Sequence, residues 1–338
     1  MQRFSPKALM LMTCLFLILS CDEKDMLSEQ EKSALFATPS TAETDSIFAQ
    51  WKQRDLTPRD YTVIQESTIL DGKYTFKMLS FKINGIKEYG ALLIPKTDVS
   101  VPVRLLIGGF GLDITTNSVN LSLDSSDPSG PYILAIPALR GQSLAITLNG
   151  TLYSSPLSEG VHCDAFDGAT DDAIAFLNLV QQTESKADVN RSSIRGGSRG
   201  GTVALLAGIR DPRIKRVVDV VGPTDLLTLT SLHENDPTYL CQFLNDLKNK
   251  QATLAETRNK LIASSPLYFA QHLPLTQLHM GLKDKNVPVD QAYGLEQKMT
   301  QLGLKSLFQL YTYDKTHADI ATDNPELAKR IAEFLAQL

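Results

Sequence analysis

The chain has 338 residues, of which 43% are hydrophobic, and a formal net charge of −5 at pH 7. This length is sufficient to bury a sizeable hydrophobic core. The acidic balance and the lack of a basic stripe argue against a nucleic-acid partner. The four cysteines and five histidines form no spaced cluster of the kind that holds a metal, so the sequence predicts no metal and no other cofactor.

The first twenty residues have the pattern of an export signal. Two basic residues precede a mostly apolar run over residues 8–19, which is too short to cross a bilayer as a helix. The run ends in Ile18-Leu19-Ser20-Cys21, which resembles a bacterial lipobox. We therefore expect residues 1–20 to be removed and Cys21 to carry lipid, which would anchor the protein to a membrane of the bacterial cell envelope, facing the periplasm or the surface. The alternative is a plain secretory signal with an incidental Cys21.

Three further segments follow the signal. Residues 21–45 are rich in Ser, Thr, Glu, Asp and Lys without clear apolar periodicity, which predicts a flexible tether. Residues 46–338 are expected to form one folded domain. Within this domain, residues 223–268 are polar and rich in helix-forming sequence, and they are a candidate helical cap.

The rest of the domain alternates between strand-like and helix-like segments. It opens with hairpin-like segments over residues 61–67 and 75–95, the second broken by Asn84-Gly85, a strong turn signal. Alternation of this kind predicts an α/β fold with a mostly parallel sheet and helices on both faces. Further strands are expected over residues 103–107, 132–137, 192–196, 214–221, 273–279 and 306–313, and helices over 168–182, 200–209, 290–302 and 324–337.

A serine bracketed by glycines joins one of these strands to the next helix. The sequence Gly196-Gly197-Ser198-Arg199-Gly200-Gly201 follows the strand at 192–196 and opens the helix at 200–209. A strand, a G-x-S-x-G turn and a helix are the context of a nucleophile elbow, in which glycine avoids collisions with neighbouring backbone. The alternative is an ordinary glycine-rich loop between a strand and a helix.

A nucleophilic serine in this context requires an acid and then a histidine later in the chain. Asp284 follows the strand expected at 273–279, and His317 follows the last strand. Both therefore lie at the carboxyl edge, where open α/β sheets build their sites. Ser198, Asp284 and His317 are the predicted catalytic triad. Asp225 is an alternative acid, and Asp314 or Asp319 could instead face His317.

Acyl transfer also requires donors for the negative charge that develops on the substrate oxygen. The expected donors are the backbone N–H of Arg199 and one from the loop after the strand at 103–107, where Gly109 and Phe110 are the candidates. This loop could equally be an ordinary glycine-rich turn.

Two cysteines remain after Cys14 in the signal and Cys21 at the lipobox. In an oxidising envelope Cys163 and Cys241 could pair and fasten the cap region to the loop before the helix at 168–182. Two buried free thiols are the alternative.

Several segments together resemble the prolyl oligopeptidase family and its dienelactone-hydrolase and acetyl-esterase relatives. The likeness covers roughly residues 60–338 and includes the segments 196–226 and 279–288, the second of which resembles the turn that carries the family's catalytic acid, here Asp284. It implies an α/β-hydrolase fold and serine hydrolysis of peptide or ester bonds. Shorter matches are Pro137-Ala138-Leu139-Arg140-Gly141-Gln142, Asp171-Asp172 and Ser264-Ser265-Pro266.

Two departures from the family concern the substrate. Ile107 stands where the family often has a tyrosine that donates to the substrate oxygen, and the segment before it is too short for the family's propeller. A short-chain carboxylesterase or acetyl esterase is therefore as well supported as a peptidase. The third possibility is a binding lipoprotein on a degenerate hydrolase scaffold. The expected partner is a small-molecule ester or a peptide.

Overall fold

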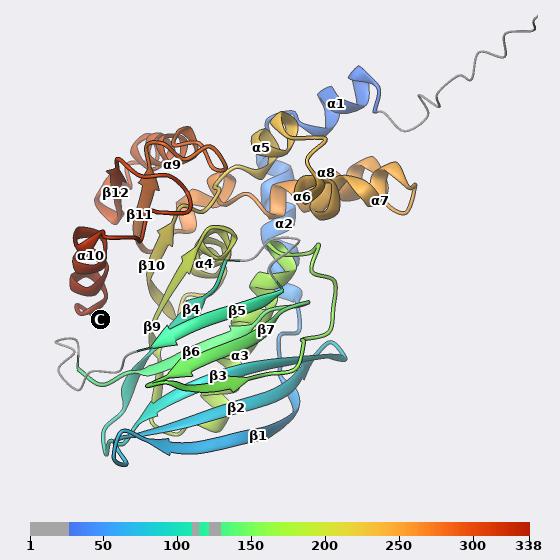
Figure 1. The fold of residues 1–338 in the computed structure, drawn as a ribbon. Coiled ribbons are helices and arrows are strands. Elements are labelled where there is room, and N and C mark those ends of the chain that lie inside the picture. The colour runs from blue at the N-terminus through green and yellow to red at the C-terminus, as the bar shows by residue number, and fades with distance from the viewer. Residues whose placement is uncertain (1–26, 110–114, 122–129) are drawn as a thin grey trace, which may run out of the picture.

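A nine-stranded sheet forms the centre of the protein, in the strand order β1-β2-β3-β6-β4-β9-β10-β11-β12 (Figure 1). The computed structural model describes residues 27–109, 115–121 and 130–338. The expected export signal, Cys21 and Phe110 lie outside these residues.

The sheet begins with antiparallel strands and continues with parallel ones. β1, β2 and β3 pair antiparallel in succession, and β3 pairs antiparallel with β6. From β6 onward every neighbouring pair is parallel, which confirms the predicted α/β class. The strands are β1 (Arg59–Ile69), β2 (Tyr74–Ile83), β3 (Ile86–Pro95), β4 (Val101–Ile107), β6 (Ile133–Ala138), β9 (Ala187–Gly197), β10 (Ile214–Val220), β11 (Leu275–Gly281) and β12 (Phe308–Tyr313).

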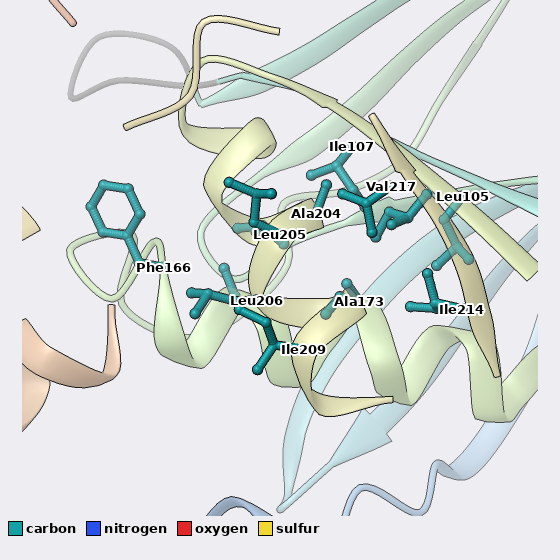
Figure 2. Packing of buried hydrophobic residues seen from close by; sticks show 14 of the residues in the cluster. Leu105, Ile107, Phe166, Ala173, Ala204, Leu205, Leu206, Ile209, Ile214 and Val217 are labelled. Carbon is teal, nitrogen blue, oxygen red and sulfur yellow. The ribbon is translucent and has the colours of Figure 1, made fainter. Parts of the chain in front are cut away.

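Four helices connect or follow the parallel strands, close to the predicted ranges: α3 (Asp167–Thr183), α4 (Arg199–Arg210), α9 (Asp290–Gln301) and α10 (Pro325–Leu335). Helix α4 is buried along nearly its whole length. Figure 2 shows Ala204 and Leu205 of α4 beside side chains of the neighbouring strands, such as Val217. A helix that is apolar all round belongs in the interior, and α4 is held there between the sheet and α3. Its first residue is thereby fixed against the sheet edge.

The sequence pattern does not predict a second, three-stranded sheet made of β5 (Thr116–Leu121), β7 (Ser143–Leu148) and β8 (Thr151–Ser154). Its buried side chains, such as Ile146, pack against Phe76 and Met78 of β2. The opposite face of β2 belongs to the main core, where Phe81 contacts Phe176 of α3 with ring centroids 5.7 Å apart. The small sheet thus covers apolar side chains on the antiparallel strands that water would otherwise reach.

The segment predicted as a tether is helical in much of its described part. Helices α1 (Glu29–Leu35) and α2 (Thr41–Gln53) each begin with a capping box, at Ser28 and Ser40. Leu35 is fully buried in the main core, and Ile47 is 1% exposed. The prediction of a flexible tether over residues 21–45 is therefore wrong from Glu29 on, because the polar residues there cap helices and form their exposed faces.

The expected cap over residues 223–268 is present as a group of short helices. They are α5 (Leu226–Leu232), α6 (Pro237–Tyr239), the π-helix η2 (Leu240–Leu244), α7 (Asn245–Lys248) and α8 (Leu254–Ala263), followed by the 3-10 segment η3 (Pro266–His272). In the part of the chain that the structure describes, we find no helix with the length and apolar character needed to cross a membrane.

Candidate active site

Ser198 stands in the turn between β9 and α4. Its φ angle is 52°, in the left-handed region that residues other than glycine rarely adopt. Its backbone N–H donates to the carbonyl of Val220 on β10 at 2.7 Å. The turn is therefore tied to the neighbouring strand, as expected of a nucleophile elbow.

Two glycines around Ser198 leave no room for a side chain. A Cβ on Gly196 would lie 1.9 Å from the carbonyl oxygen of Gly200, and one on Gly200 would lie 2.7 Å from that of Gly108. Gly197 differs, because a Cβ there would have nothing within 4 Å. The predicted crowding thus holds at Gly196 and Gly200 and is absent at Gly197.

Ser198, His317 and Asp284 form a continuous chain of contacts. Ser198 Oγ lies 2.8 Å from His317 Nε2, and His317 Nδ1 lies 2.7 Å from Asp284 Oδ2. The other carboxylate oxygen of Asp284 accepts from the N–H groups of Asn286 and Val287, both at 2.9 Å. These two backbone hydrogen bonds fix the orientation of the Asp284 carboxylate, and therefore the direction from which it contacts the imidazole ring of His317.

The other candidate acids point elsewhere. Asp225 caps helix α5, where its oxygens accept from Thr228 and from the hydroxyl of Tyr268. Asp314 pairs with a lysine, and Asp319 accepts from a nearby threonine. The structure therefore brings Asp284, among the four aspartates considered, against His317.

His279, which belongs to the resembling segment, is a core residue. It is fully buried on β11, with Nδ1 3.0 Å from the Tyr313 hydroxyl and Nε2 3.2 Å from the side-chain oxygen of Gln277. Burial lowers the pKa of His279 to about 3, so the ring is neutral at ordinary pH. His279 therefore has a structural role in the core, and His317 is the histidine that contacts Ser198.

The loop after β4 lies directly against the elbow. A Cβ on Gly109 would be 3.3 Å from Ser198 Cβ and 3.0 Å from the carbonyl oxygen of Gly197. On the other side, Arg199 begins α4, and the first N–H groups of a helix have no carbonyl partner within it. Two of the predicted donors, at Arg199 and Gly109, are thus beside the serine, while Phe110 lies outside the described residues.

A cavity of about 620 Å³ opens above Ser198 and His317. The cap supplies one wall of this cavity, and the turn after β11 supplies another. The lining residues are Gly109, Phe166, Ser198, Arg199, Pro223, His233, Asp236, Thr238, Tyr239, Lys285, Asn286, Val287 and His317.

A disulfide between Cys163 and Cys241 ties the cap to the loop before α3, with Cα atoms 5.2 Å apart. Of the two possibilities that the sequence left open, the structure has the bonded one. Within the described ranges, the two sulfurs and His162 are the group with ligand atoms close enough to share a metal. Metals bind thiolates, and a disulfide offers none.

Sequence reasoning missed a fully buried carboxyl group beneath the elbow. Asp219 lies on β10, where one oxygen accepts from the N–H of Gly222 at 2.8 Å. A Cβ on Gly201 of α4 would lie 1.9 Å from that oxygen, so helix and carboxyl group are in close contact. Burial raises the pKa of Asp219 to about 8. A single acid within the otherwise apolar run 217–221 is the signal that could have found it.

Comparison with known proteins agrees with this geometry. Residues 149–338 match the sequence family described as the prolyl oligopeptidase family. Acetyl xylan esterase 1 from Thermoanaerobacterium sp. JW/SL YS485 is similar in structure, with a TM-score of 0.63 and 16% identity over 93% of this chain and 99% of that chain. No curated protein matches the sequence.

Two peptidases have similar structures as well. Acylaminoacyl peptidase of Pyrococcus horikoshii has a TM-score of 0.55 and 17% identity over 78% of this chain and 41% of that chain. For dipeptidyl peptidase 4 of Porphyromonas gingivalis, the TM-score is 0.54 and the identity 20%, over 85% of this chain and 36% of that chain. The chain thus spans less than half the length of either peptidase, and at these identities the likeness concerns the fold.

The family match and the similar structures together show that the protein is a serine hydrolase with the α/β-hydrolase fold. The family match covers more than half of the sequence. The chain belongs to the prolyl oligopeptidase family.

Replacement of Gly196 by alanine is expected to disrupt the elbow, because the added methyl group meets backbone at 1.9 Å and neither segment can withdraw. We expect a lower melting temperature and loss of hydrolytic activity. Gly197→Ala is the matched control, and it should keep both, because its methyl group enters open space. Equal behaviour of the two variants in a thermal melt and an ester assay would contradict the crowding.

Asp219 should make stability depend on pH. Its folded pKa of about 8 lies above the value of about 3.9 for an unfolded aspartate, so folding takes up a proton between these limits. Stability should therefore fall as pH rises through this range and level off above it. Asp219→Asn does not titrate there, so urea unfolding should show its stability relative to wild type increasing from pH 5 to pH 8. A constant difference would contradict the assignment.

Proposed function

We propose that the protein hydrolyses carboxylic esters of short acyl chains, with Ser198 as nucleophile, His317 as general base and Asp284 as the carboxylate that orients the histidine. The observation that carries this proposal is the contact chain from Ser198 Oγ to His317 and on to Asp284, at 2.8 Å and 2.7 Å. Hydrogen-bond distances of this kind are those that proton transfer requires.

The reaction would proceed in two steps. His317 Nε2 takes the hydroxyl proton as Ser198 Oγ bonds to the substrate carbonyl carbon, and it gives that proton to the leaving alcohol as the ester bond breaks. Water then attacks the acyl-enzyme, with its proton passing through the same nitrogen, and the acid is released. The N–H of Arg199 and a donor from the loop at Gly109 and Phe110 would hold the negative oxygen in both steps.

The site favours a small substrate. The cavity volume of about 620 Å³ lies in the range of small-molecule sites, and the cap forms part of its wall. Peptide bonds are the second candidate, because the family and two of the similar structures are peptidases. A peptide would need to enter the same cavity beside the cap.

Variants of the two aspartates test the triad. Asp284→Asn should lower kcat for 4-nitrophenyl acetate by about 10⁴, the loss measured for the corresponding change in a serine protease, because the imidazole loses its oriented tautomer. Asp225→Asn is the matched control and should retain most activity, because Asp225 caps a helix and does not contact His317. Ser198→Ala should be inactive. Similar losses for both aspartate variants would contradict the assignment, and proline-containing peptides assayed in parallel would separate an esterase from a peptidase.

We also propose that Cys21 carries the lipid that attaches the protein to a membrane of the cell envelope, as its lipobox-like context indicates. Cys21→Ser should move the protein from the membrane pellet to the soluble fraction of fractionated cells. An unchanged distribution would contradict the anchor.

A further inference from the structure

The buried carboxyl group of Asp219 lies on β10, beneath the elbow. In the strand register its neighbours are Gly196 of β9 and Leu278 of β11. Its Oδ1 packs against two glycines, because a Cβ on Gly201 would lie 1.9 Å from this oxygen and a Cβ on Gly222 would lie 2.4 Å from it. The carboxyl group therefore fills the space between the first turn of α4 and the end of β10.

The same carboxyl group closes the turn that holds the nucleophile. Oδ1 of Asp219 accepts from the N–H of Gly222 at 2.8 Å, and between them lies Val221 with a φ angle of 55°. A left-handed φ is rare for a β-branched residue and persists only where neighbouring contacts hold it. The carbonyl of Val220, in the same turn, accepts from the N–H of Ser198 at 2.7 Å. The turn 219–222 thus connects the carboxyl group to the backbone of the serine.

The surroundings of Asp219 favour the uncharged acid. The residue is fully buried, and Oδ2 has no hydrogen-bond partner among the residues that the structure describes. The N–H of Gly201 donates to the carbonyl of Ser198 at 2.8 Å, so it is not directed at the carboxyl group. The described neighbours from α4, β9 and β11 are Gly201, Gly196 and Leu278, which cannot ionise. Burial therefore raises the pKa of Asp219 to about 8, although the N–H of Gly222 opposes the shift.

We propose that Asp219 is a positioning residue of the active site, whose uncharged carboxyl group keeps the Ser198 turn in its catalytic conformation, so that hydrolysis is lost when Asp219 ionises. This inference rests on the ester hydrolysis proposed above and adds its regulation by pH. A carboxylate at this place is an unpaired charge shielded from water, which disfavours the conformation that buries it. Water can reach the carboxylate only if α4 or the turn 219–222 moves, and both hold the serine.

The pH dependence of ester hydrolysis tests the proposal. For 4-nitrophenyl acetate, with the enzyme-free rate subtracted, the wild-type kcat should fall about tenfold or more between pH 7 and pH 9.5, with a midpoint at about pH 8, because the carboxylate predominates above the pKa. The fall should appear in kcat more than in KM, because the turn orients the nucleophile. Return to pH 7 should restore kcat, which distinguishes the change from irreversible unfolding.

Variants then assign the fall to its residue. Asp219→Asn keeps an oxygen for the N–H of Gly222 and cannot ionise, so its kcat should be nearly constant between pH 7 and pH 9.5. Asp219→Ser is a second uncharged variant, which should have a lower kcat at every pH and the same flat profile. Asp188→Asn is the matched control: Asp188 lies near the start of β9 and pairs with Arg191, so the wild-type profile should remain.

The outcomes separate this inference from the ester hydrolysis. A wild-type kcat that does not fall up to pH 9.5, or an equal fall in an uncharged variant, overturns the role of Asp219 and leaves Ser198-dependent hydrolysis intact. Failure of both uncharged variants to fold overturns it as well, because the uncharged side chain is the one that should fit. If the wild-type protein does not hydrolyse the ester, the proposed ester hydrolysis fails. The rate at which a fluorophosphonate labels Ser198 over the same pH range then decides the role of Asp219, with the same expected profiles.

Discussion

Backbone from three neighbouring strands meets around Ser198, and at two of the surrounding glycines no other residue fits. The carbonyls of Gly108 and Gly200 occupy the positions that side chains at Gly200 and Gly196 would need, and the N–H of Ser198 is bonded to β10. A residue with a left-handed φ persists only where its surroundings hold it there. This crowding presents the hydroxyl to the cavity and places the start of α4 behind it. His317 and Asp284 can act on the Ser198 hydroxyl only because the turn holds the serine in this orientation.

The remaining parts of the site are held by contacts farther back. Arg140 pairs with Asp164 and with the fully buried side chain of Asp172, and so fixes the loop that leads into α3. Glu88 lies beside this cluster, and burial together with the charge of Asp172 raises its pKa well above the usual range. The same loop carries Phe166 and the disulfide to the cap. The cavity wall is therefore positioned by partly buried ion pairs on one side and by a covalent bond on the other.

Much of the arrangement can be predicted from the sequence because it depends on local rules. Parallel strands place the residues that follow them at one edge, so the loops with Ser198, Asp284 and His317 are expected together once the strands are recognised. The glycines also indicate the elbow, and the crowding at Gly196 is local because it comes from the nearby carbonyl of Gly200. The choice of Asp284 over Asp225 does not follow from such a local rule, because both residues come after strands. Only the tertiary structure shows that Asp225 caps a helix.

Other parts could not be predicted, for equally physical reasons. The strands of the small sheet are short, and their role in covering β2 and β3 is a long-range contact that no periodicity records. Polar residues before residue 46 fit a tether as well as they fit capped helices until burial of Leu35 decides between them. Pairing of Cys163 with Cys241 likewise depends on where the cap lies.

The central claim is that the contacts with His317 make the Ser198 hydroxyl a nucleophile. A fluorophosphonate reacts covalently with such a serine, so intact-protein mass spectrometry followed by peptide mapping tests the claim directly. The account predicts a single adduct on the peptide that contains Ser198, and much slower formation of that adduct in His317→Ala. No adduct on the wild-type protein, or an adduct at another serine that forms equally fast in His317→Ala, would contradict it.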